Sequence, residues 1–201
     1  MQGDEKGNVI KCLLDPNKLR EDGTASLRTY NISKNGKYLV YGVSYGGSDW
    51  FTIFVRDIKT GKDLDKDKIE WCKFSSIEFD YNCNGFYYNC YEPPSGMKDG
   101  EEGGTETAAA KNQMVKYHII GEDPKNDELV YKSPDQPDWM FGTTVTKGDG
   151  KYLLITNNDS CNPVNRLYIH AVSDKKEDSS SGDVRKVVKA VDHLKAKWDY
   201  L

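Results

Sequence analysis

SKNGKYLVYG (residues 33–42) combines a polar turn with a run of strand-forming residues, and the chain repeats this pattern twice. The later copies are DYNCNGFYYNCY (80–91) and TKGDGKYLLIT (146–156). Each copy has Asn-Gly or Asp-Gly, one further residue, a Tyr and then an apolar run. Such dipeptides supply the positive φ angles of tight hairpin turns, because glycine has no Cβ to clash. The pattern therefore predicts three related β-hairpins.

The spacing of the three turns predicts a repeat architecture. Gly36, Gly85 and Gly150 lie 49 and 65 residues apart, and β-prone runs bounded by turn residues recur between them. A period of roughly 40–50 residues with four strands is typical of β-propeller blades. We therefore expect an all-β fold, a single partial β-propeller domain over residues 1–201 with about three four-stranded antiparallel blades. The expected blades cover residues 26–71, 73–132 and 139–189.

Two polar stretches interrupt this pattern. Residues 92–112 (EPPSGMKDGEEGGTETAAAKN) are acidic and rich in Gly and Pro, a composition that cannot bury enough apolar area to fold by itself. We expect a mobile loop here, between two strands of the second blade, which accounts for the longer second interval. Residues 173–183 (SDKKEDSSSGD) have the composition of a shorter loop of the same kind. KAVDHLKAKW (189–198) has a helix-like pattern but lacks a capping residue, so no helix is expected there.

Composition narrows the classes of function. The net charge is −4 and no basic stripe is visible, which argues against nucleic-acid binding. No apolar run approaches the ~20 residues of a membrane span, and the start MQGDEKGN does not resemble a signal peptide. The five cysteines are an odd number without a C-x-x-C pair, which favours reduced thiols in a cytoplasmic protein over a zinc or redox motif. No cofactor is expected.

The histidines give little indication of a metal site. His118 and His170 occupy comparable places in two expected third strands, and we interpret both as hydrogen-bonded strand residues rather than metal ligands. His193 is interpreted as a surface residue. The segment NNDSCNP, which begins at Asn157, offers oxygen ligands of the kind that bind calcium, but it lacks the spacing of a known calcium loop. A turn is the default interpretation, and no metal site is predicted.

Six aromatic residues could form a peptide-binding patch: Tyr38, Trp50, Trp71, Tyr87, Trp139 and Tyr152. The three tyrosines occupy the same place in the three quoted hairpins. Residues that recur at one place in each repeat are typical of packing between repeats. Packing between blades is therefore the favoured interpretation, and a peptide-binding patch is the alternative.

One serine has neighbours that imitate a catalytic motif. In YGGSDW (45–50), Ser48 follows two glycines, as in the G-x-S-x-G turn that presents a catalytic serine between a strand and a helix. Trp50 stands where the last glycine should be, and a strand-like run follows instead of a helix. Ser48 is therefore interpreted as a turn residue, and no catalytic residue is predicted.

Longer irregular strings carry a more specific signal. The stretch LLDPNKLREDGTASLRTYNISKNGKYLVYGVSYGGSDW (13–50) resembles the prolyl oligopeptidase family. Further matching strings follow in order: WCKFSSIEFD (71–80), GGTETAAAKNQMVKYHIIGED (103–123), QPDWMFG (136–142) and NNDSCNPVNRLYIH (157–170). The resemblance extends from about Asn8 to Leu201. It lies within the seven-bladed propeller that caps an α/β-hydrolase domain in this family.

The resemblance implies the propeller portion of a serine-type endopeptidase that cleaves after proline in short peptides. In this family the propeller restricts the entry of large, folded substrates. The Ser-Asp-His triad belongs to the hydrolase domain, which has no counterpart in these residues, so the chain alone is expected to be inactive. Its partners would be that hydrolase domain and short peptides. We expect NVIKCLL (8–14) and KWDYL (197–201) to belong to adjoining blades, and the chain to be a fragment.

The resemblance also nominates two substrate-cavity residues in WCKFSSIEF (71–79). This innermost strand would begin near the cavity between the propeller and the catalytic domain. Several family members carry a cysteine at the position of Ser76, which makes them sensitive to thiol reagents. Cys72 is not aligned with that position, so this sensitivity is not carried over. Lys73 would line the cavity and orient a peptide carbonyl, with a solvated rim charge as the alternative interpretation.

A different class of function remains open at this point. A free-standing half-propeller could act as a non-enzymatic protein-binding module. Its exposed first and last strands would be unpaired edges, and such edges invite pairing with another chain. Self-association through exposed blade edges is then expected.

Overall fold

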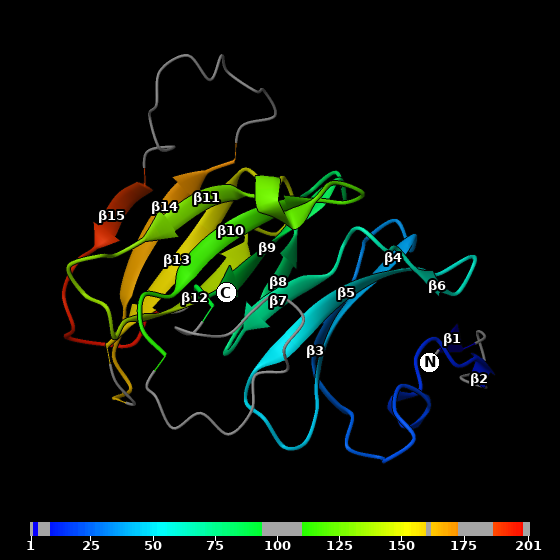
Figure 1. Ribbon diagram of the computed structural model, residues 1–201. Coiled ribbons are helices and arrows are strands. Elements are labelled where there is room, and N and C mark those ends of the chain that lie inside the picture. Colours follow the sequence, from blue (N-terminus) through cyan, green and yellow to red (C-terminus); the bar gives the residue numbers. More distant parts are fainter. Residues whose placement is uncertain (1, 4–8, 94–109, 160–161, 173–186, 199–201) are drawn as a thin grey trace.

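A computed structural model describes residues 2–3, 9–93, 110–159, 162–172 and 187–198 of the chain (Figure 1). Most of the loop expected at 92–112 lies outside the described residues, as do the loop expected at 173–183 and Cys161. Within the described part, no helix is long and apolar enough to cross a membrane. Its helices are two short 3₁₀ turns, η1 (Pro16–Lys18) and η2 (Pro124–Asn126).

Three antiparallel sheets follow one another along the chain, each built from consecutive strands. The first sheet contains β3 (Ser26–Ile32), β4 (Tyr38–Ser44), β5 (Phe51–Asp57), β6 (Lys62–Asp63) and β7 (Ile69–Cys72). The second contains β8 (Ile77–Phe79), β9 (Gly85–Cys90), β10 (Met114–Ile119) and β11 (Glu128–Lys132). The third contains β12 (Met140–Val145), β13 (Tyr152–Asn158), β14 (Arg166–Ala171) and β15 (Val187–Val191). The predicted all-β partial propeller is confirmed.

The three quoted hairpins share one turn geometry, in which two residues exchange a pair of hydrogen bonds across the turn. The backbone N–H of the first residue donates to the carbonyl of the second, and the side-chain oxygen of the first accepts from the N–H of the second. The pairs are Ser33 with Tyr38, Asp80 with Gly85, and Thr146 with Tyr152. Gly85 is therefore the equivalent of Tyr38 and Tyr152. The prediction that Tyr87 shares their place is wrong by two residues.

The reason for this shift is that the second hairpin turns on a different residue type. Cys83 takes the left-handed conformation in that turn, with φ of 57°, where the other turns use Gly36 and Gly150 at 68° and 63°. Gly85 instead begins β9, where a Cβ would lie 2.2 Å from the backbone oxygen of His118. Glycine is therefore required at position 85 because β10 lies so close, and not because of the turn.

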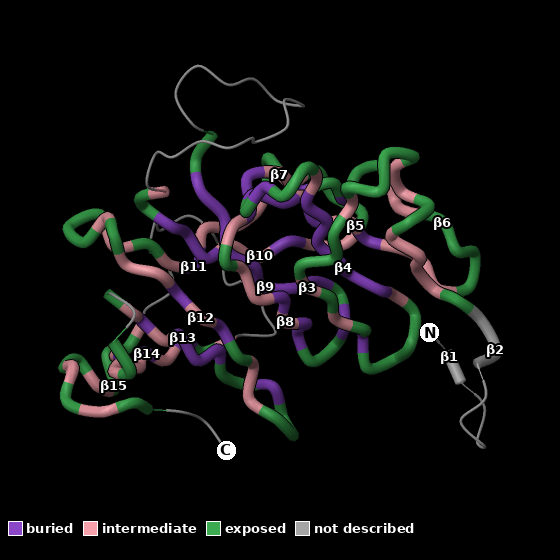
Figure 2. Tube along the Cα trace, turned by 90° about the horizontal axis from the view of Figure 1, so that it is seen from below, coloured by how far each residue is buried: buried purple, intermediate pink, exposed green. Residues whose placement is uncertain are grey.

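Each sheet packs on the next through a buried interface that we call a seam. The first seam joins the first and second sheets, and the second seam joins the second and third sheets. β9 contributes to both, because successive side chains of a strand point to opposite faces. Phe86 and Tyr88 enter the first seam, whereas Tyr87 enters the second. β9 is accordingly buried along its whole length (Figure 2).

Two of the three tyrosines that were predicted to pack between blades do so. Tyr87 is buried in the second seam, and Tyr38 packs at the margin of the first. Tyr152 is 46% exposed, so the prediction of inter-blade packing is wrong for this residue. Tyr152 is the first residue of β13. Because side chains alternate along a strand, it lies on the face of the third sheet that points away from the second seam.

The N-terminal segment lies outside the first sheet, and its place in an adjoining blade stays a prediction. β2 (Val9–Lys11) pairs with β1 (Gln2–Gly3) in a separate two-stranded ribbon. The leucines that follow, Leu13, Leu14 and Leu19, pack on the free face of the first sheet, against Leu39, Tyr41 and Val43. Burial of these apolar side chains fixes the path of the segment.

Candidate functional site

The nominated residues lie where the chain passes from the first sheet to the second. Lys73 and Ser76 belong to the connection between β7 and β8. The turn between β4 and β5 lies at the same end of the sheets, because Phe51 at the start of β5 pairs with Cys72 at the end of β7. We call this end of the molecule the connection end.

The backbone of this connection is held in an unusual conformation. Trp71 and Phe74 have φ of 59° and 52°, in the left-handed region that side chains other than glycine rarely adopt. Such residues persist where surrounding contacts hold them. The carbonyl of Trp71 accepts a hydrogen bond from the Tyr91 N–H at 3.0 Å, and that of Lys73 accepts one from the Gln113 side-chain amide at 3.1 Å. The two contacts fix the place from which Lys73 extends.

Lys73 belongs to a compact group of charges at the connection end. Its Nζ lies 3.4 Å from Asp49 Oδ2, and the other oxygen of Asp49 lies 3.3 Å from a guanidinium nitrogen of Arg28. The lysine side chain is 13% exposed and its ammonium lies over the ring of Trp50, at 5.5 Å from the ring centre. Lys73 is therefore not a solvated rim charge. Two cations share one carboxylate, which leaves this group with a net positive charge.

Ser76 lies in a separate, uncharged network. Its hydroxyl contacts Thr143 Oγ1 at 2.5 Å on β12 and Asn89 Oδ1 at 3.1 Å on β9. The amide of Asn89 donates to the carbonyl of Phe141 at 3.1 Å. Thr143 and Asn89 are buried. Ser76 thus joins the second sheet to the third, and the structure does not bring it together with Lys73, three residues away in sequence.

Ser76 also borders a groove of about 460 Å³ on the third sheet. Its other lining residues are Gly142, Thr143, Thr144, Leu154, Thr156 and Leu167. Threonine hydroxyls line it together with two leucine side chains, and its volume falls within the range of roughly 300–1,000 Å³ that is common for ligand sites. The groove therefore presents both polar and apolar lining residues. Contact of Ser76 or Lys73 with a substrate stays a prediction.

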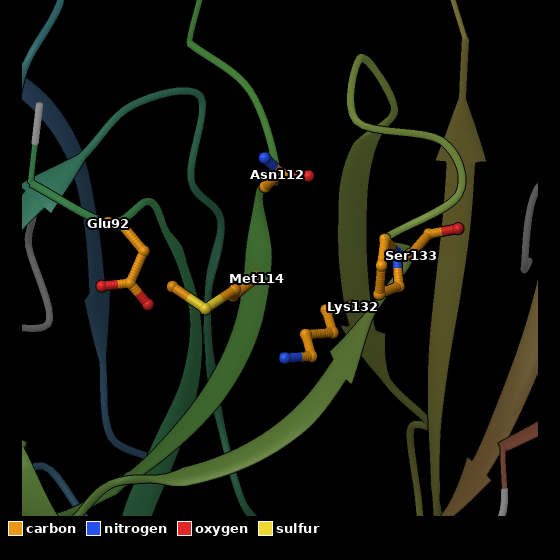
Figure 3. Close-up of a pocket in the computed structure, with 6 residues that line it drawn as sticks. Glu92, Asn112, Met114, Lys132 and Ser133 are labelled. Carbon is orange, nitrogen blue, oxygen red and sulfur yellow. The ribbon is translucent and has the colours of Figure 1, made fainter.

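A second, smaller groove of about 230 Å³ lies on the second sheet, at the end of β9 and β11 and the start of β10. Its lining residues are Glu92, Asn112, Met114, Lys132, Ser133 and Pro134. Figure 3 shows the Met114 side chain with the Glu92 carboxylate on one side and the Lys132 ammonium on the other. The sequence carries no pattern that brings these residues together.

The tryptophans nominated for a peptide patch mainly pack on protein. Trp50 and Trp71 meet edge to face with ring centres 5.9 Å apart, and Tyr91 meets Trp50 in the same way at 5.5 Å. All three are buried. Trp139 lies under the guanidinium of Arg166 at 4.3 Å. The packing interpretation is confirmed for Trp50 and Trp71, whose cluster supports the strained connection at Lys73.

Ser48, His118 and His193 behave as the sequence predicts. Ser48 lies in the turn before β5 and its hydroxyl accepts a hydrogen bond from the Trp50 N–H at 3.0 Å. His118 and His170 are the fifth residues of β10 and β14, buried and in equivalent positions. His118 has carboxylate partners on both ring nitrogens. His193 is exposed.

The thiols near the connection are protected. Burial raises the pKa of Cys72 well above its ordinary value, and burial raises the pKa of Cys90 to about 11. Because the thiolate is the reactive form of cysteine, neither residue is activated at neutral pH. This agrees with leaving Cys72 out of any thiol-sensitive site.

Three polar residues of this region, Asp49, Asn89 and Gln113, were not predicted from the sequence. Each reaches the site from a strand or turn distant in sequence, and a single polar residue in a strand gives no signal of its partner. Gln113 is the clearest case, since its amide bonds both the Lys73 carbonyl and, at 2.6 Å, the N–H of Phe141. One buried side chain thus touches the connection and the third sheet.

Comparison with known proteins places the whole chain in one context. The profile of the family described as prolyl oligopeptidase, N-terminal beta-propeller domain, matches residues 2–201. Prolyl oligopeptidase A of Amanita bisporigera is 37% identical over 176 residues, covering 82% of this chain and 23% of that protein. The prolyl endopeptidase of Dictyostelium discoideum is 33% identical over 220 residues, covering 96% of this chain and 28% of that protein.

The solved structures that match this chain are also prolyl oligopeptidases and endopeptidases. Prolyl oligopeptidase B from Galerina marginata, bound to a 35mer hydrolysis and macrocyclization substrate, matches with a TM-score of 0.77 and 26% identity, over 92% of this chain and 25% of that one. A structure from a study of two prolyl endopeptidases and their inter-domain dynamics matches with a TM-score of 0.74 and 28% identity, over 94% and 24%. The chain spans about a quarter of the length of the relatives that it matches.

Proposed function

Because the chain belongs to the prolyl oligopeptidase family through its N-terminal β-propeller domain, we propose that it forms the substrate-gating part of a serine-type prolyl endopeptidase. The match of residues 2–201 to the propeller domain carries this proposal. The relatives named above are prolyl oligopeptidases and endopeptidases, and one of the matching structures holds a peptide substrate.

The role of this chain would be steric and orienting. Cleavage after proline would proceed by acyl transfer through a serine ester, with a histidine as base and backbone donors for the oxyanion. Those groups would come from an α/β-hydrolase domain, the expected partner, so the chain alone would be inactive. The connection end would face short peptides. Lys73, held by Asp49 and the Trp50 ring, offers a positioned donor for a peptide carbonyl.

A chimera tests this proposal. This chain would replace the matching 28% of the Dictyostelium discoideum prolyl endopeptidase. We expect cleavage after proline in a short chromogenic peptide and no cleavage of a folded protein with exposed prolines. K73A should raise KM for the peptide, while K34A, at the exposed turn before β4, serves as the matched control. Equal cleavage of the peptide and the folded protein would refute the gating role, and identical kinetics of K73A and K34A would refute the role of Lys73.

A second candidate is a non-enzymatic module that associates with itself. The observation in its favour is the uncovered outer part of the third sheet, where Val188 on β15 is 55% exposed and the groove beside Leu154 and Leu167 lies open. Exposed strands of this kind pair readily with a second chain. Sedimentation velocity distinguishes the two cases, because a concentration-independent monomer would exclude self-association.

We also propose a cytoplasmic location. Cys12, Cys72, Cys83 and Cys90 are all free thiols, and a reducing compartment preserves this state. Microscopy of a tagged chain in its own cells would test the location, and signal in a secretory compartment would contradict it.

A further inference from the structure

A buried histidine bridges the first seam near the end of β10 that is remote from the connection. His118 is completely buried. Its Nδ1 lies 2.8 Å from Asp127 Oδ1, directly before β11, and its Nε2 lies 3.0 Å from Asp67 Oδ1. Asp67 comes from the first sheet, in the segment between β6 and β7, and is itself buried. The imidazole therefore connects two sheets through two carboxylates.

The geometry determines which groups carry protons. An ionised carboxylate only accepts hydrogen bonds, so a ring placed between two of them must donate from both nitrogens. Each carboxylate accepts one further hydrogen bond. Asp127 Oδ2 accepts from the Tyr88 hydroxyl at 2.7 Å, and Asp67 Oδ1 accepts from the Gly121 N–H at 2.6 Å. With both carboxylates ionised, the bridging ring is an imidazolium.

The Tyr88 hydroxyl and the two thiols near the bridge stay uncharged across neutral and mildly alkaline pH. Burial raises the pKa of Tyr88 and that of Cys72 well above their ordinary values, and burial raises the pKa of Cys90 to about 11. Lys116 on β10 contributes a positive charge that acts on both thiols. Within this cluster, His118 is therefore the group that loses its charge first as pH rises.

We propose that the Asp67–His118–Asp127 bridge is an alkaline-sensitive lock, which holds the first seam closed while His118 is charged and releases it when His118 loses its proton. A neutral ring can donate from one nitrogen only, so one buried carboxylate would then lose its partner. A buried charge without a partner is strongly unfavourable, and separation of Asp67 from the second sheet lets water reach it. The contacts of Ser76 with Thr143 and of Asn89 with Phe141 across the second seam carry no charge.

The direction of the effect follows from linkage. Burial lowers the pKa of His118, but hydrogen bonds to Asp127 and Asp67 outweigh this and raise it from the ordinary 6.5 to about 9. The stabilisation is fully present below pH 6.5 and is lost as pH rises towards 9. Over that window the unfolding equilibrium constant should increase on the order of a hundredfold from this group.

NMR of the chain with ¹⁵N-labelled histidine tests the charge state directly, with no variant needed. At pH 7 we expect both ring nitrogens of His118 to carry protons. A His118 ring with one protonated nitrogen at pH 7 would overturn the proposal, because the bridge would then contain a protonated carboxyl instead.

Hydrogen exchange tests the release of the seam. The Gly121 N–H donates across the first seam to Asp67, and the Phe141 N–H donates across the second seam to Gln113. After correction for intrinsic exchange, we expect the protection of Gly121 to fall between pH 7 and 9.5 while that of Phe141 is maintained. H118Q should remove this difference by leaving Gly121 weakly protected at pH 7 as well. A parallel loss at both amides in the unaltered chain would refute a lock confined to the first seam.

Discussion

The first and second seams bury similar apolar side chains but join their sheets by different polar contacts. The first seam contains the ionic bridge of Asp67, His118 and Asp127. The described hydrogen bonds from Ser76 and Asn89 across the second seam are between neutral hydroxyl, amide and backbone groups. Two interfaces of the same kind therefore differ in their polar contacts, which are ionic in the first seam and neutral at Ser76 and Asn89 in the second.

The difference teaches that the strength of a buried contact and its dependence on conditions are separate properties. Buried ions interact strongly, but they must be paired, and removal of one partner leaves an uncompensated charge. Neutral hydrogen bonds contribute less and do not titrate. The first seam should be the more vulnerable to substitution and to pH. The neutral contacts of Ser76 and Asn89 in the second seam should each contribute less and should not depend on pH.

The largest effect is expected from H118L. Leucine leaves Asp67 and Asp127 buried without a counter-charge, which should lower the free energy of unfolding by roughly 3–5 kcal/mol. Urea titration at pH 6.5, followed by tryptophan fluorescence, measures the change. A loss no larger than that of a second-seam variant would show that the bridge contributes no more than a neutral contact.

A smaller effect is expected from N89L in the second seam. The substitution leaves the Ser76 N–H and the Phe141 carbonyl without their partner. The expected loss is about 2 kcal/mol, the usual penalty for stranded buried groups. The same titration at pH 6.5 and pH 9.5 should give the same loss, because no charged group is involved. A loss that changes between the two pH values would contradict the neutral character of this seam.

A still smaller loss of stability is expected from T143V, also in the second seam. It removes one hydroxyl while keeping the shape of the side chain, so the loss should be about 1 kcal/mol. S76A, on the other side of the same contact, is the matched variant. The double variant should lose less than the sum of the two single losses, since both remove the same hydrogen bond. Full additivity would show that the two hydroxyls do not interact.

The smallest perturbation is chemical labelling of thiols in the unaltered protein. Cys72 and Cys90 lie in the first seam, whereas Cys12 is exposed. At pH 7, iodoacetamide should label Cys12 quickly and the seam thiols slowly, as peptide mass spectrometry can resolve. H118Q should accelerate labelling of Cys72 and Cys90, and N89L should leave both nearly unchanged. Similar acceleration in the two variants would mean that the seams do not open independently.

The sequence predicts the fold well because the relevant signals are local. Tight-turn residues and β-prone runs recur at a regular interval, and they identify three sheets without knowledge of any long-range contact. The alignment of the second repeat failed because Gly85 resembles a turn glycine. Its glycine reflects contact with β10, which lies more than thirty residues away.

The site was predicted only in part. Resemblance to a family nominated Lys73 and Ser76, and the structure shows that they belong to different networks. Asp49, Asn89 and Gln113 could not be found, because each interacts with a partner that the neighbouring sequence does not contain. The bridge is similar, since His118 was predicted as a satisfied strand histidine while neither of its carboxylates was identified.

The order of the seams along the chain has a consequence for biosynthesis. All members of the ionic bridge lie between residues 67 and 127, and β11 ends at Lys132 before β12 begins at Met140. A nascent chain can therefore close the first seam before the third sheet has been translated. The third sheet would then pack on a second sheet that is already folded, and Asn89 and Gln113 would form their hydrogen bonds with the backbone of Phe141 at that stage. During synthesis from the N-terminus the blades would therefore fold one at a time, and the first seam would close before the second.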